Sequence, residues 1–136
     1  MEDIKKLIEA NLPFVETLLT EYGDFYPLAC AIDNNDDIKQ VGTHFGEEHP
    51  SSNEVLTELK KAFRATKDDY KTIGIFYDVR IMDPNTGLKT DAVATFLESK
   101  SDDKAFTFYF PYQLTDGQLI FSESWRNEND KEIYLY

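Results

Sequence analysis

Apolar residues recur at helical spacing in the first part of the chain. Between residues 4 and 22 they fall three or four positions apart, at Ile4, Leu7, Ile8, Val15, Leu18, Leu19 and Tyr22. This pattern predicts an amphipathic helix whose apolar side faces the core. Pro13 lies inside the stretch and lacks a backbone N–H donor, so we expect a kink or two shorter helices there. Gly23 follows as the expected C-cap.

A second helix is predicted for the stretch "PSSNEVLTELKKAFRATKDD". Ser51 and Glu54 have the S-x-x-E spacing of a capping box, and Pro50 can pack against Val55 as a hydrophobic staple. The apolar residues of this stretch form one stripe, made of Val55, Leu56, Leu59, Ala62 and Phe63. We expect that stripe to pack against the rest of the fold.

The remaining apolar runs are typical of β-strands. "FYPLACAID" and "IKQVGTHF" flank the turn "NNDD" and form an expected hairpin. Four further runs follow, "KTIGIFYDVRIMD", "LKTDAVATFLES", "KAFTFYFPYQL" and "QLIFSESWRN", and "KEIYLY" is a candidate for a last edge strand. Short turns such as "DPNTG" and "TDG" separate them. Connections of this length join antiparallel strands, because parallel crossovers need about a dozen residues or more.

The expected element order is therefore α-β-β-α-β-β-β-β. It predicts an α+β two-layer sandwich, with an antiparallel sheet of about six strands and the two main helices on one face. The chain of 136 residues contains no linker or repeat, so we expect a single domain over residues 1–136.

The composition limits the classes of molecule that the protein is expected to bind. The chain is 41% hydrophobic and 14% aromatic, with a formal net charge of −12. This charge argues against nucleic acid and anionic membranes, which attract clustered lysine and arginine, but it suits a basic protein partner. We find no signal peptide and no apolar run long enough for a bilayer, so we expect a cytoplasmic protein. Cys30 lies in an apolar run and is expected to be a buried hydrophobe.

The stretch "GTHFGEEHP", residues 42–50, contains both histidines of the chain. His44, Glu47, Glu48 and His49 are its candidate functional residues. The two histidines are five positions apart rather than the four that place a metal-binding pair on one helix face. We therefore expect a loop that leads into a helix, with the glutamates near its positive N-terminus and with no metal or cofactor. A small-ligand site or an enzyme active site at this loop is the alternative.

A second cluster lies on the predicted strands. Strand alternation places Asp78 and Arg80 on one face, and Asp91 on the next strand can reach them as a cross-strand ion pair. Phe76 and Tyr109 are expected to point away from the helices, onto the second face of the sheet. Together these five residues form a predicted interaction patch, apolar at its centre and charged at its rim. No residue is predicted to be catalytic.

Several strings in the chain resemble a family of small bacterial proteins. "EYGDFYPLACAID", "VGTHFGEEHPSS", "YDVRI" and "KTDAV" are similar to the family patterns "GEFYPFA", "G…G.E.HP" and "YDVRV". The resemblance covers roughly residues 18–125. It implies a single domain in the bacterial cytosol, and it adds no catalytic residue because no activity is established for the family. The His49–Pro50 pair belongs to the pattern, which keeps His49 among the candidates.

These observations predict a non-enzymatic protein-interaction domain. Its most specific version is an immunity-type protein that neutralises a basic toxin by covering it with acidic and aromatic residues. A small-ligand-binding protein or enzyme with its site at residues 42–50 is one alternative. A dimeric structural or regulatory module is another.

Overall fold

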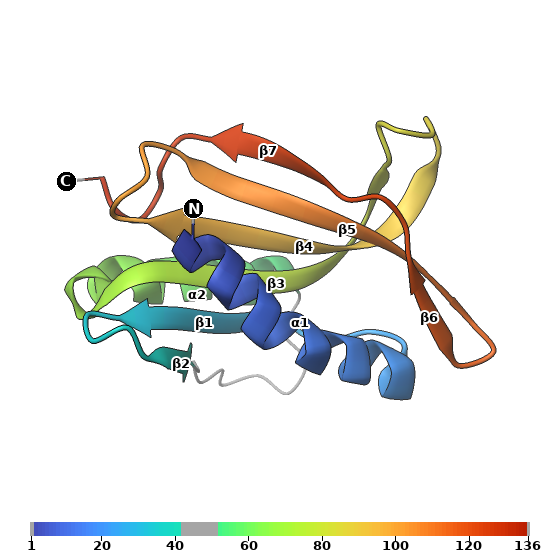
Figure 1. Cartoon of the computed structure of the whole chain (residues 1–136), viewed down its shortest axis with the longest axis horizontal. Coiled ribbons are helices and arrows are strands. Elements are labelled where there is room, and N and C mark those ends of the chain that lie inside the picture. Colours follow the sequence, from blue (N-terminus) through green and yellow to red (C-terminus); the bar gives the residue numbers. More distant parts are fainter. Residues whose placement is uncertain (1, 42–51, 136) are drawn as a thin grey trace.

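The computed structural model describes residues 2–41 and 52–135. Its elements, in chain order, are α1 (Glu2–Tyr22), β1 (Leu28–Asp33), β2 (Ile38–Val41), α2 (Ser52–Ala65), a short 3₁₀ helix (Lys67–Asp69), β3 (Tyr70–Met82), β4 (Lys89–Ser99), β5 (Ala105–Thr115), β6 (Gln118–Phe121) and β7 (Trp125–Asn129). The strands form one curled sheet in the order β2-β1-β3-β4-β5-β6, with β7 also paired to β5, and each described pair is antiparallel (Figure 1). The predicted α+β class and element order are confirmed.

The run predicted as the last long strand is two strands in the structure. β6 and β7 both pair with the same edge of β5, β6 beside residues 112–115 and β7 beside residues 105–109. The two-residue loop between β5 and β6 has left-handed backbone angles, with φ of 52° at Asp116 and 77° at Gly117. Such angles suit a tight hairpin turn, for which Asp-Gly is a preferred sequence.

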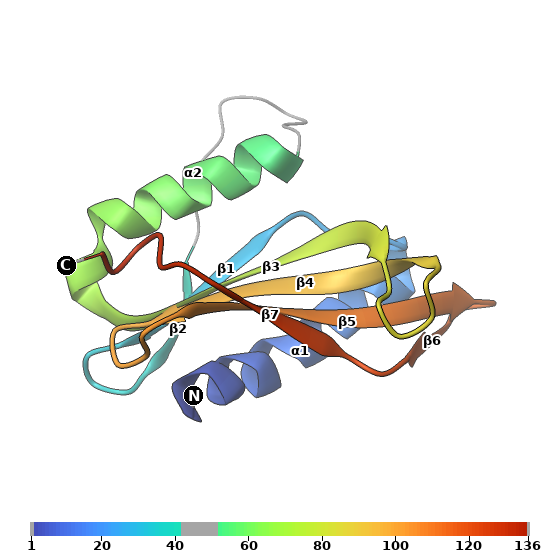
Figure 2. The same ribbon diagram turned by 90° about the horizontal axis from the view of Figure 1, so that it is seen from above.

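The two helices cover opposite faces of the sheet (Figure 2). α1 packs against one set of strand residues, which includes Cys30, Phe76 and Leu97. α2 packs against the alternate set, which includes Ile73 and Phe96. The expectation that both helices share one face is wrong. The physical reason is that the central strands are apolar on both sides, so each face needs a cover.

α1 is one helix through Pro13 rather than two. It ends as expected at Gly23, whose φ of 79° allows its N–H to donate to the Leu19 carbonyl at 2.9 Å. The helix lies close to the sheet over Gly74. A Cβ at that position would stand 2.8 Å from Leu97 Cδ2 and 3.4 Å from Leu7 Cδ1, so the absence of a side chain on β3 permits this packing.

The C-terminal segment is held by a buried carboxylate. Glu98 of β4 is fully buried, and its carboxylate accepts hydrogen bonds from the backbone N–H of Glu132 at 2.7 Å and of Ile133 at 2.9 Å, and from that of Tyr134. Burying a charged group is costly unless it is hydrogen-bonded, and these three bonds offset that cost. Lys60 of α2 also pairs with Glu132 at 3.0 Å. The segment proposed as an edge strand is therefore an irregular cover beside α2.

Further sequence predictions concern Cys30, the start of α2 and the capacity to cross a membrane. Cys30 is buried as expected, and burial raises the pKa of its thiol to about 12. Pro50 and Ser51, the start of the expected staple and capping box, lie outside the described residues. No helix in the described ranges has both the length and the apolar character that crossing a membrane requires.

Candidate functional site

The predicted aromatic centre of the interaction patch does not form. Phe76 is fully buried under α1. Tyr109 lies on the opposite face of the sheet, where its ring stacks on Trp125 with 5.1 Å between centroids. The prediction failed because Phe76 lines up across the strands with Thr95 and Phe108, and this is the face that α1 covers.

The charged part of the predicted cluster does come together. Arg80 and Asp91 are opposite each other in the β3–β4 register, and Arg80 Nη1 lies 3.3 Å from Asp91 Oδ1. The predicted cross-strand ion pair is confirmed. Both side chains are more than half exposed, so this pair contributes little to stability.

Asp78 has a more enclosed environment than its charged neighbours. Its Oδ1 accepts a hydrogen bond of 2.8 Å from the hydroxyl of Tyr112. Burial raises the pKa of the Asp78 carboxyl, and the nearby carboxylates of Asp91 and Asp24 raise it further, while the bond from Tyr112 acts in the opposite direction. A cation beside Asp78 would reverse this effect, because it favours the ionised form.

Asp78 also lines a groove that was not predicted from the sequence. The groove encloses about 700 Å³ beside the C-terminal half of α1 and the start of β1. Its lining comes from α1, from the connection to β1, from the start of β1 and from β3, and consists of Phe14, Leu18, Tyr22, Asp24, Phe25, Tyr26, Leu28 and Asp78. We call it the aromatic–acidic groove.

Three aromatic side chains of the aromatic–acidic groove are widely exposed. Phe14 is 51% exposed, Tyr22 70% and Tyr26 54%. Tyr22 was expected on the buried side of the first helix, and this expectation is wrong. Phe14, Leu18 and Tyr22 are four residues apart, so they form a second stripe on α1 beside the buried one. That spacing is the signal by which the sequence could have indicated the groove.

This combination of side chains suits a cationic group. Aromatic faces attract ammonium and guanidinium ions, and a carboxylate in the same pocket adds a charged acceptor. The apolar stems of lysine and arginine can pack on aromatic rings while their charged ends reach a carboxylate. Asp24 and Asp78 supply that acceptor in the aromatic–acidic groove.

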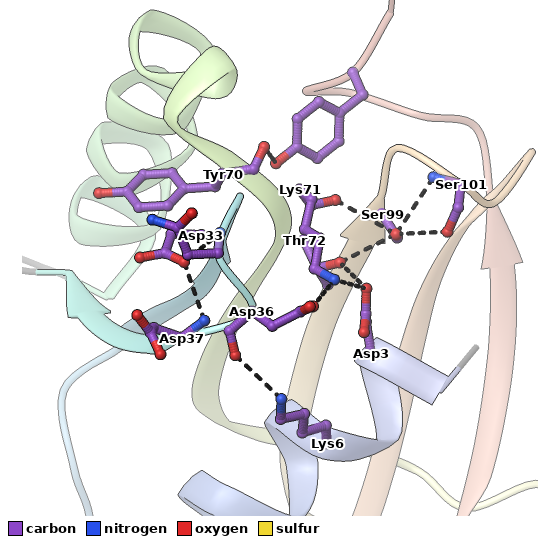
Figure 3. A network of polar contacts seen from close by, with 12 residues as sticks. Asp3, Lys6, Asp33, Asp36, Asp37, Tyr70, Lys71, Thr72, Ser99 and Ser101 are labelled. Atoms are coloured by element: carbon purple, nitrogen blue, oxygen red, sulfur yellow. Dashed lines mark hydrogen bonds and ion pairs between the residues drawn. The ribbon is translucent and has the colours of Figure 1, made fainter.

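A polar network at the other end of α1 has a different character (Figure 3). The Thr72 hydroxyl donates to Asp3 Oδ2 at 3.3 Å and lies 3.1 Å from Ser99 Oγ, and Lys71 pairs with Asp3 and Asp36. Thr72 and Ser99 are almost completely buried, so a substrate cannot reach these hydroxyls. The network joins α1, the β1–β2 turn and β3, and its role is structural.

The other candidate residues stay as predictions. His44, Glu47, Glu48 and His49 lie outside the described residues. Within residues 2–41 and 52–135, no three histidine, cysteine, aspartate or glutamate side chains are grouped as a metal ion would require.

Comparisons of the chain with protein families, with characterised proteins and with solved structures find no match. The function is therefore argued from the aromatic–acidic groove itself.

Proposed function

We propose that the protein is a non-enzymatic protein-interaction domain of the cytoplasm, whose aromatic–acidic groove binds a basic partner protein. The observation that supports this proposal is the exposure of Phe14, Tyr22 and Tyr26 around one groove that also contains carboxylates. Contiguous exposed aromatics on a monomer are characteristic of interaction sites. Aromatic side chains also supply most of the binding energy where they fill a partner's surface.

The net charge favours a basic partner over a second copy of the chain. Two copies would each carry a formal charge of −12 and repel each other at low ionic strength. A basic partner would instead be attracted, which speeds its association. An immunity-type role is the most specific version of the proposal, in which the groove covers lysine or arginine residues of a toxin.

The test compares two double variants of matched chemistry. Tyr22→Ser with Tyr26→Ser removes two exposed aromatics from the aromatic–acidic groove. Leu88→Ser with Ile120→Ser removes two large apolar residues of similar exposure, 70% and 59%, from other surfaces. Wild type and both double variants would be immobilised, exposed to lysate of the source organism and analysed by mass spectrometry. We expect a basic protein to be retained by wild type and by the Leu88/Ile120 variant, but not by the Tyr22/Tyr26 variant.

Three outcomes would contradict the proposal. The first is an identical set of bound proteins for all three baits. The second is retention of acidic partners only. The third is a stable homodimer in analytical ultracentrifugation that the Tyr22/Tyr26 variant converts to a monomer, because the groove would then bind a second copy.

A further inference from the structure

Among the residues that the structure describes, no strand pairs with one side of β3 next to the aromatic–acidic groove. β4 pairs with β3 as far as Met82. On the other side β1 pairs with β3 only as far as Phe76. Among the described strands, none pairs with this second side of β3 from Tyr77 to Met82. The open stretch begins where Asp78 enters the groove.

The backbone groups that face the open side can be identified. Lys100 N donates to Lys71 O at 2.9 Å, and Asp83 N donates to Leu88 O at 2.8 Å. The odd-numbered residues of β3 therefore direct their backbone groups towards β4. Backbone groups of successive residues in a strand point to opposite sides. The N–H and C=O groups of Asp78, Arg80 and Met82 must then point towards the open side.

The side chains along this edge differ between the two faces of the sheet. On the α1 face the open stretch presents Asp78, beside the carboxylate of Asp24 in the groove, followed by Arg80, which pairs with Asp91, and by the exposed Met82. On the α2 face it presents Val79 and Ile81, both half-buried. An added strand alternates its side chains in the same way. Its best match is therefore a sequence with a cationic residue opposite Asp78 and apolar residues towards Val79 and Ile81.

We infer that the open edge of β3 accepts an extended segment of the basic partner as an added strand, with a lysine or arginine side chain of that segment entering the aromatic–acidic groove beside Asp78. This inference rests on the proposed function and specifies how the partner binds. Backbone hydrogen bonds to Asp78 and Arg80 supply affinity, and the alternating side chains supply specificity. Charge complementarity identifies the occupant, because the chain carries a net charge of −12 and the groove contains two carboxylates.

Hydrogen exchange in the free protein tests the open edge directly. The amides of Val79 and Ile81 point towards β4 and are expected to exchange slowly, whereas those of Asp78 and Arg80 are expected to exchange at least about tenfold faster. Neighbouring residues of one strand serve as the internal control. Equal protection of the four amides would overturn the inference, because this side of β3 would then already be paired within the chain.

Binding of a short fluorescent peptide that alternates arginine and valine tests the added strand. Two versions carry N-methyl groups, one on every arginine and the other on every valine. An added strand directs only one of these sets of N–H groups to β3, so we expect one version to lose about tenfold or more in affinity and the other to keep it. Asp78→Asn should weaken binding of the arginine peptide about tenfold, but not that of a peptide with neutral citrulline in place of arginine.

The outcomes separate this inference from the proposed function. Equal affinity of both N-methylated peptides would reject strand addition while leaving the groove as a binding site. Absence of peptide binding up to about 1 mM would also reject strand addition, and the comparison of the Tyr22/Tyr26 and Leu88/Ile120 variants would still decide the proposed function independently.

Discussion

At the scale of single residues, Asp78 links the chemistry of the groove to the stability of the protein. Burial raises the pKa of its carboxyl above the ordinary value of 3.8. The folded protein therefore holds this proton to a higher pH than the unfolded chain does. The contribution of Asp78 to the free energy of unfolding is fully present below pH 3.8 and declines as the pH rises through the raised pKa.

The first prediction at this scale concerns Asp78→Asn, which keeps an oxygen acceptor for Tyr112 but cannot ionise. Relative to wild type, we expect the free energy of unfolding of this variant to increase as the pH rises above 3.8. Tyr112→Phe is the matched control, since it removes the hydrogen bond that favours the ionised form of Asp78. In this variant the free energy of unfolding should decline more steeply with rising pH than in wild type. Urea denaturation between about pH 3.5 and about pH 7 measures both effects. If the difference in free energy of unfolding between Asp78→Asn and wild type did not change with pH, the raised pKa of Asp78 would be contradicted.

At the scale of elements, the C-terminal segment depends on one strand residue rather than on its own secondary structure. Three consecutive backbone N–H groups, those of Glu132, Ile133 and Tyr134, donate to the Glu98 carboxylate. Glu98→Gln replaces one acceptor oxygen by an N–H₂ donor of nearly the same size. We expect the free energy of unfolding to fall by about 2–3 kcal/mol, because hydrogen bonds to a charged group are lost in a buried site.

Glu132→Gln is the control for this prediction. It neutralises a carboxylate in the same segment, but one whose side chain is 40% exposed in its pair with Lys60. Its expected cost is below about 1 kcal/mol. Chemical denaturation compares the two variants, and proteolysis near residue 131 reports release of the segment. Equal effects of the two substitutions would show that the Glu98 carboxylate does not hold the C-terminus.

At the scale of the whole molecule, the excess of acidic residues acts on folding as well as on partner choice. With a formal net charge of −12 on 136 residues, the acidic side chains repel one another in the compact folded state. The ion pairs Arg80–Asp91 and Lys104–Asp130 are more than half exposed on both sides and offset little of this repulsion. We expect the melting temperature near pH 7 to rise by about 2–5 °C between about 0.02 M and about 0.2 M NaCl, because salt screens the repulsion.

The same protein near its sequence pI of about 4.5 provides the control. Its net charge is close to zero there, so the rise with salt should vanish or change sign. Differential scanning calorimetry at the two pH values measures the effect. A rise of the same size at both would attribute it to general salting-out rather than to charge repulsion.

The sequence by itself determined the elements and much of their pairing. Helical and alternating periodicities depend on neighbouring residues only, so the two helices, the central strands and the cap at Gly23 could be predicted from them. Strand parity and the short "DPNTG" turn also placed Asp78, Arg80 and Asp91 close together, because a hairpin register follows from its loop.

The tertiary structure alone decided which surfaces are covered. Parity shows that Phe76 and Asp78 share a face, but not that α1 lies over Phe76 and ends beside Asp78. The spacing of Phe14, Leu18 and Tyr22 defines a stripe on α1, but not which of two neighbouring stripes meets the sheet. Likewise, no local pattern connects Glu98 with a C-terminal segment more than thirty residues later in the chain. These outcomes depend on how segments that are distant in the sequence pack together. The burial pattern along one element does not show which other element packs against it.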